Sequence, residues 1–161
     1  MTLRLTIALV VFLRFAVPAS AQTFTLTANL TGAGEATQTK DGINTGAFGT
    51  ATVIVDMRAR TVTYRVDVFN LPSGVTASHI HVGPANTNGP VVVTFAPPLT
   101  ASNDFAFSGT VHDTDFVLRP DQGIRSADDM FQAIIGGNAY VNVHSQANPG
   151  GEIRGQLALK K

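Results

Sequence analysis

Hydrophobic and polar residues alternate along most of the chain after residue 22. In the run TFTLTANL, residues 23–30, every second residue is apolar, and the runs at 49–57 and 61–71 have the same period of two. This alternation is typical of β-strands with one face in a core. Further strands are predicted at residues 77–82, 91–95, 104–112, 138–144 and 152–159. Short turns rich in Gly, Pro, Asn and Asp separate them, so the pattern predicts an all-β fold, an antiparallel β-sandwich with Greek-key connections.

One short helix is predicted, at residues 127–135. Ser126 can accept a hydrogen bond from the first turn, and two aspartates follow it where the helix dipole favours negative charge. Met130 and Ile134 fall on one face of this helix, and Gly136 is a natural end for it.

Three segments rich in glycine connect the predicted strands. Residues 32–46 form a polar loop that is long enough for a local function, although we assign no chemistry to it. Residues 83–90 and 148–152 are tight turns next to the strands that carry histidines. These two turns either shape a site or simply connect strands.

The N-terminal 21 residues have the pattern of a signal peptide. Arg4 precedes an apolar run at 5–13, and the small residues of ASA at 19–21 fit the cleavage rule. We therefore expect a signal peptide at 1–21 and one mature domain at 22–161. The apolar run is shorter than the roughly 20 residues of a membrane span, so we predict export to the periplasm or the cell exterior. Retention as an uncleaved anchor is the alternative.

Composition narrows the range of partners and chemistry. The formal net charge is zero, and removal of the N-terminal segment leaves nine basic residues against eleven acidic ones. No basic field would attract nucleic acid, so we predict no nucleic-acid partner. Cysteine is absent, which excludes thiolate metal sites, iron–sulfur clusters and cysteine nucleophiles. An exported domain without disulfides must be held by its core alone, or by its core and a metal ion.

Two histidines lie one residue apart in the run ASHIHVGPANTNGP, residues 77–90. On a strand His79 and His81 point to the same face, with Cα atoms about 6–7 Å apart, so both rings can reach one ion. The same parity in the run AYVNVH places His144 on the polar face of a later strand. Imidazole ligands suit copper and zinc, and the three histidines are therefore a candidate site for one such ion.

Other polar residues share the face predicted for these histidines. Asn142, Glu152 and Arg154 have the same strand parity and would surround the three rings, where they could orient them. The alternative is that the histidines belong to a hydrogen-bonded polar network that orders the loops. His112 lies next to Asp113, and it is either a surface residue or a further ligand.

The motifs around the histidines resemble those of the chordin-type, or CHRD, domain. The shared pattern is His-Ile-His, Gly-Pro-Ala and Asn-Gly-Pro-Val-Val, followed by Ala-Tyr-Val-Asn-Val-His and Asn-Pro-Gly-Gly-Glu-Ile-Arg-Gly-Gln. The runs LTGAGE and GTATVIVD also look like the start of that domain, so the resemblance covers about residues 23–159. It implies an exported single-domain protein of the bacterial type and a role for His79, His81 and His144.

A narrower resemblance links the chain to copper–zinc superoxide dismutases. These are also β-sandwiches, and they bind copper through a His-x-His strand and a late Val-His. The resemblance implies a superoxide-dismutase- or immunoglobulin-like layout and one copper or zinc ion. The cysteine pair of that family is missing here, and no counterpart of its zinc-binding cluster is visible, so dismutase activity is not predicted.

Taken together, the residues favour a non-enzymatic, extracytoplasmic binding module with a protein or surface ligand that the sequence does not identify. No nucleophile–base pair and no carboxylate pair can be argued from spacing, so we predict no catalytic residue and no organic cofactor. The alternative is a copper- or zinc-binding protein that uses the three histidines. A metal-dependent enzyme is a third hypothesis.

Overall fold

Among the residues that the structure describes, nine strands form one antiparallel sheet. The computed structural model describes residues 22–36, 41–98 and 102–161, and the predicted signal segment lies outside them. The strands are β1 (Thr23–Thr31), β2 (Phe48–Asp56), β3 (Thr61–Phe69), β4 (Val75–Val82), β5 (Val91–Thr94), β6 (Phe105–His112), β7 (Ala139–Ser145), β8 (Ile153–Gln156) and β9 (Ala158–Leu159). Their order across the sheet is β5-β4-β7-β8-β1-β2-β3-β6, and β9 pairs with β1.

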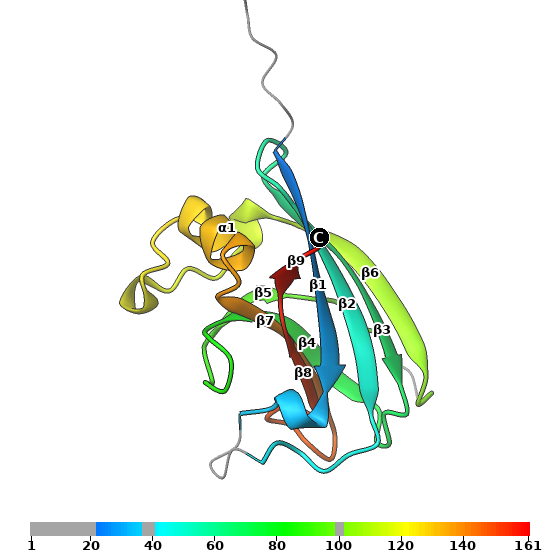
Figure 1. The fold of residues 1–161 in the computed structure, drawn as a ribbon. Coiled ribbons are helices and arrows are strands. Elements are labelled where there is room, and N and C mark those ends of the chain that lie inside the picture. The colour runs from blue at the N-terminus through cyan, green and yellow to red at the C-terminus, as the bar shows by residue number, and fades with distance from the viewer. Residues whose placement is uncertain (1–21, 37–40, 99–101) are drawn as a thin grey trace, which may run out of the picture.

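The sheet is nearly closed into a barrel, which corrects the predicted sandwich. A sandwich has two sheets packed face to face, whereas here the described strands belong to one sheet that curves around the core (Figure 1). The backbone N–H of Ala96, just after the end strand β5, donates at 3.1 Å to Tyr64 Oη on β3, the strand next to the other end of the sheet. Period-two alternation has the same form in both architectures, because each has one buried sheet face, and it therefore could not distinguish them.

The predicted core positions are confirmed on the first three strands. Leu26, Ala28 and Leu30 of β1 are buried and alternate with exposed residues. They face the same interior as the valines of β2 and β3. Strand β2 lies between the other two and pairs along its whole length with β1 on one side and with β3 on the other. Nine residues on each of these strands give a long ladder that holds one wall of the molecule.

The other wall differs, because β7 and most of β8 are buried on both faces. One face carries Val141, Val143 and Ile153 into the hydrophobic core. The opposite face carries polar side chains that are nevertheless covered. The strand predicted at 152–159 is divided here into β8, which pairs with β7 and with β1, and β9, which pairs with β1.

Helix α1 (Ala127–Ile135) begins and ends where the sequence predicts. Ser126 Oγ accepts from the backbone N–H of Asp129 at 3.2 Å, and Gly136 is the C-terminal cap. Met130, Phe131 and Ile134 are buried against the sheet. The structure adds three short 3-10 helices, η1 (Gly32–Gly34), η2 (Asp113–Asp115) and η3 (Pro120–Gln122). None of the described helices is long and apolar enough to cross a membrane.

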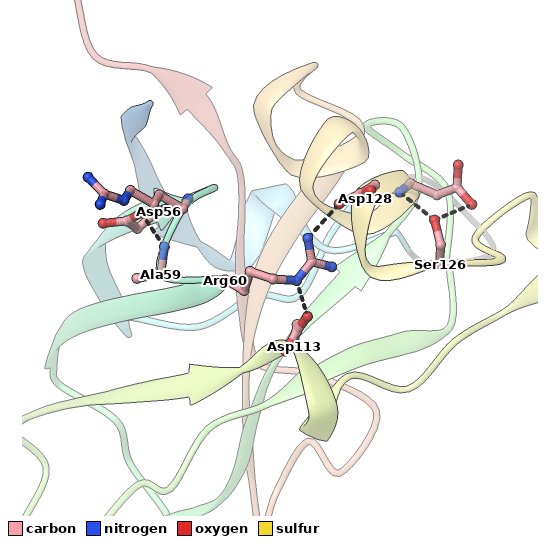
Figure 2. Close-up of polar contacts among 8 residues, drawn as sticks. Asp56, Ala59, Arg60, Asp113, Ser126 and Asp128 are labelled. Carbon is pink, nitrogen blue, oxygen red and sulfur yellow. Dashed lines mark hydrogen bonds and ion pairs between the residues drawn. The ribbon is translucent and has the colours of Figure 1, made fainter. Parts of the chain in front are cut away.

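The turn between β2 and β3 is tied to α1 by one arginine (Figure 2). Arg60 donates to Asp113 through Nε and to Asp128 through Nη1, the latter at 2.9 Å. Asp56 Oδ1 shapes the same turn by accepting from the backbone of Ala59 at 2.7 Å. The arginine is partly exposed, so we assign these pairs a role in positioning the turn and α1 rather than a large stabilisation.

Candidate metal centre

The three histidines predicted as ligands meet on the covered polar face of β4, β7 and β8. His79 and His81 come from β4, and His144 comes from β7. In the β4–β7 pairing, His79 is opposite Asn142 and His144 is opposite Ala77, so His144 is the diagonal neighbour of His79. Diagonal side chains on adjacent strands can touch when they are large, and imidazoles are.

The rings lie close enough to share one ion. Their centroids are 5.0 Å apart for His79 and His144, 5.6 Å for His79 and His81, and 6.0 Å for His81 and His144. One ring nitrogen from each residue lies within 4.8 Å of the other two. His81 and His144 are each 8% exposed, and His79 is partly exposed, so the site lies at the edge of the solvent.

Backbone carbonyls fix the orientation of two of the rings. His81 Nδ1 donates to the carbonyl of Gly89, and His144 Nδ1 donates to that of Pro149, both at 2.9 Å. A neutral imidazole has one N–H, so the Nε2 atoms of both rings carry free electron pairs. This is the arrangement of metal-binding histidines, whose second nitrogen is held by an outer hydrogen bond.

The remaining nitrogens distinguish a metal centre from a closed polar network. Without a metal, His79 Nδ1 donates to His144 Nε2 at 3.2 Å. With an ion between them, His79 would carry its proton on Nε2 instead, and both of these nitrogens would be ligands. His81 Nε2, however, is buried and has no hydrogen-bond partner. An unpaired buried polar atom costs about 1–3 kcal/mol, so a partner is expected at this nitrogen. A metal ion would satisfy it.

Burial keeps all three imidazoles neutral. It lowers the pKa of His79 to about 4, with smaller contributions from His144 and His81. Burial also lowers the pKa values of His81 and His144, against the opposing effect of their hydrogen bonds to carbonyls. Since only a neutral ring can donate an electron pair to a metal, the three imidazoles have the charge state that metal ligands need at neutral pH.

The His81 ring is also held by a stack of two further side chains, Tyr140 and Arg154. The Tyr140 ring lies parallel to the His81 ring, with centroids 4.9 Å apart and planes 11° apart. Arg154 Cζ lies 3.4 Å from the centroid of the same tyrosine ring. Its Nη2 also donates to the carbonyl of Pro84 at 3.0 Å. The guanidinium thereby fixes the tyrosine, and the tyrosine fixes the plane of the histidine.

Two glycines let the loops close over this face. A Cβ atom on Gly89 would lie 1.6 Å from the carbonyl oxygen of Val82, so only glycine fits there. Gly151 has a φ of 132°, and a Cβ on it would lie 2.6 Å from Asn142 Nδ2. Of the two alternatives left open for these turns, the structure favours the one in which they shape the site, because they supply the carbonyls that hold His81 and His144.

The residues predicted to surround the trio have different roles in the structure. Asn142 lies between His79 on β4 and Arg154 on β8. Glu152 is buried, and its carboxylate accepts from Thr45 Oγ1 at 2.6 Å and from Ser145 Oγ, so it anchors a loop rather than a ring. His112 is exposed at the end of the edge strand β6, and it is not part of the described metal-binding group.

Glu35 was not among the predicted site residues, and it lies in the loop to which no chemistry was assigned. Its carboxyl is only 6% exposed, and Oε2 accepts from Asn142 Nδ2 at 3.5 Å. Burial raises its pKa to about 7, although nearby Arg154 opposes the shift. The chain contains only two glutamates, Glu35 and Glu152, and both are buried here. A lone glutamate among small residues was the signal available for it.

Comparison with known proteins gives one match. The model of the CHRD domain matches residues 26–157, which is most of the chain and includes every residue of the site. No curated protein matches, and no solved structure matches.

Proposed function

The chain belongs to the CHRD domain family, and from that premise we propose that it is an exported, non-enzymatic binding module for one copper or zinc ion. His79, His81 and His144 would be the ligands. CHRD domains are typical of extracellular proteins, which supports the export predicted from residues 1–21. The proposal assigns no catalytic residue.

One observation carries this proposal: three neutral imidazoles converge, and one of them presents an unpaired buried nitrogen. The distance of 3.2 Å between His79 Nδ1 and His144 Nε2 also fits a shared ion. With metal–nitrogen bonds of about 2.0–2.1 Å in tetrahedral geometry, two ligand nitrogens lie about 3.3 Å apart. His81 Nε2 would then complete a three-nitrogen site by a small movement of the ring.

The ligand set limits the choice of metal. Three imidazoles without thiolate or carboxylate suit copper and zinc, whereas calcium and magnesium require oxygen ligands. The two carboxyl groups of the site face other partners, as the contacts of Glu152 and Glu35 show. Arg154 adds a positive charge nearby, so the site must bind its cation through coordination bonds rather than through a negative field.

The test is the metal content of the purified protein after loading with Cu(II) or Zn(II) and desalting. We expect about one equivalent in the unsubstituted protein and almost none in His81→Ala, which removes the unpaired nitrogen. His112→Ala is the matched control, because His112 is exposed and outside the group, and it should retain the full equivalent.

Absence of retained metal in the unsubstituted protein would contradict the proposal. The histidines would then form a structural polar cluster. The binding module would have to recognise a protein or surface ligand instead.

A further inference from the structure

A pocket of about 250 Å³ lies next to the polar face but does not include the histidines. Three segments line it: residues 35–36 with Ile43, Asn88 from the loop after β4, and residues 147–151. Asn88 Nδ2 donates to the carbonyl of Ala36 at 2.9 Å and holds two of these segments together. The volume is enough for a small organic molecule but not for a large one.

The wall of the pocket contains one unpaired buried oxygen. Glu35 is more than nine-tenths buried, and its Oε1 has no hydrogen-bond partner. The same oxygen lies 2.8 Å from the position of a Cβ on Gly151, which is itself a lining residue. The carboxyl is held from behind by Asn142 through its other oxygen. Glu35 is one of the residues that line the pocket, but Oε1 itself has almost no accessible surface, so the carboxyl must turn toward the pocket to meet a ligand.

The rest of the lining is neutral. Ala36, Ile43, Ala147 and Pro149 are apolar, and Asn88 and Asn148 carry uncharged amides. Among the described lining residues none is basic. A buried carboxylate in such surroundings calls for a ligand that donates hydrogen bonds and carries positive charge.

We propose that this pocket binds a small primary ammonium compound, whose N–H groups donate to Glu35 Oε1 while its alkyl part contacts Ala36, Ile43 and Ala147. This site is separate from the metal centre and does not depend on metal being bound. Arg154 is the charged group that acts on the carboxyl. Because it repels other cations, we expect a ligand with one positive charge rather than several.

The test is titration of the metal-free protein with propylammonium chloride at constant ionic strength, followed by amide chemical shifts in NMR. A pH of about 8 is suitable, because the pKa of Glu35 is raised to about 7 and the carboxylate is then mostly ionised. We expect saturable shifts in residues 147–151. The neutral 1-propanol should bind roughly tenfold more weakly or worse, since a charge-assisted hydrogen bond is lost.

Two variants separate the carboxylate from the shape of the pocket. Glu35→Gln keeps the shape and should weaken propylammonium binding by about tenfold or more. Gly150→Val should block the pocket without disturbing the fold, because a Cβ at Gly150 meets no atom within 4 Å. Gly46→Val is its matched control outside the pocket, also with no atom within 4 Å, and it should bind normally.

The proposal is overturned if propylammonium causes no saturable shifts, if 1-propanol binds equally well, or if Glu35→Gln binds like the unsubstituted protein. An amide NMR spectrum of each metal-free variant that matches the unsubstituted protein outside the substituted region confirms that the fold is intact. The result is independent of the metal proposal, because binding is measured in metal-free protein.

Discussion

At the scale of single residues, the polar face differs from the rest of the described structure in its buried polar atoms that have no hydrogen-bond partner. Glu35, His81, Asn142, Arg154 and Gln156 each have a buried polar atom without a hydrogen-bond partner in the structure. Native proteins have few such atoms, and a concentration of them marks a place that gives up stability for function. Two of them, on His81 and Glu35, are the atoms on which the two proposals rest.

Glu35 should make the stability of the protein depend on pH. Its pKa is about 7 in the folded protein and about 4.5 in the unfolded chain, so the folded state binds more protons between these values. Stability from this group is therefore full below pH 4.5 and is lost as the pH rises through 7. Integrated over that range, the loss is at most about 3 kcal/mol.

Glu35→Gln removes this titrating group. The free energy of unfolding of the variant should therefore rise relative to that of the unsubstituted protein as the pH rises. We expect the difference in free energy of unfolding between the two proteins to change by about 1–3 kcal/mol between pH 5 and pH 8, in favour of the variant. Urea denaturation of the metal-free proteins at both pH values measures it. Asp121→Asn, at an exposed position, is the control and should show no such trend. A constant difference for Glu35→Gln would show that the carboxyl titrates normally.

At the scale of elements, the loop between β4 and β5 is the part that completes the candidate metal centre. Gly89 lies against Val82, its carbonyl accepts from His81, and its N–H donates to Tyr140 Oη at 3.0 Å. A single loop residue therefore connects the strand that carries His79 and His81 with the strand that carries His144.

Gly89→Ala should damage both stability and metal binding. The added Cβ would lie 1.6 Å from the Val82 carbonyl oxygen, so the backbone must move and His81 must lose its anchor. We expect a loss of about 2–4 kcal/mol in free energy of unfolding, measured by urea denaturation, together with weaker retention of Cu(II).

Gly46→Ala provides the comparison, because its Cβ meets no atom within 4 Å. It should change stability by no more than about 0.5 kcal/mol. Equal effects of the two substitutions would show that the close approach at Gly89 has no particular importance.

Strand parity was enough to predict which residues share the polar face, but not that this face is covered. His79, His81 and His144 are brought together as their alternation indicated, and the helix cap at Ser126 is confirmed. The burial of Arg154 depends on loops that fold back over the sheet, and no periodicity within a strand reports such contacts. Glu35 was missed for the same reason, because its neighbours are distant in sequence.

At the scale of the whole molecule, the alternation predicted an all-β antiparallel fold, and that much is confirmed. The choice between two packed sheets and one curved sheet is made by the closing contacts, such as that between Ala96 and Tyr64. These contacts join residues far apart in the chain. The nearly closed sheet gives the molecule one rigid wall of β1, β2 and β3, and a second wall whose polar face carries the site.

The stack of Tyr140 on His81 has an optical consequence. The protein has two tyrosines and no tryptophan, so its ultraviolet fluorescence comes from Tyr64 and Tyr140 alone. Tyr64 lies among Phe95 and Phe107 on the other wall, whereas Tyr140 is in ring contact with a proposed metal ligand. Cu(II) bound there should quench the Tyr140 emission, and Zn(II), with its filled d shell, should not.

Fluorescence titration with each ion checks this in the unsubstituted protein and in two variants. Tyr140→Phe should lose the copper response and Tyr64→Phe should keep it. An unchanged response in Tyr140→Phe would mean that copper binds elsewhere. If the expected pattern is found, Tyr140 is an intrinsic fluorophore next to the three histidines. Its emission then distinguishes Cu(II) from Zn(II) without any added label.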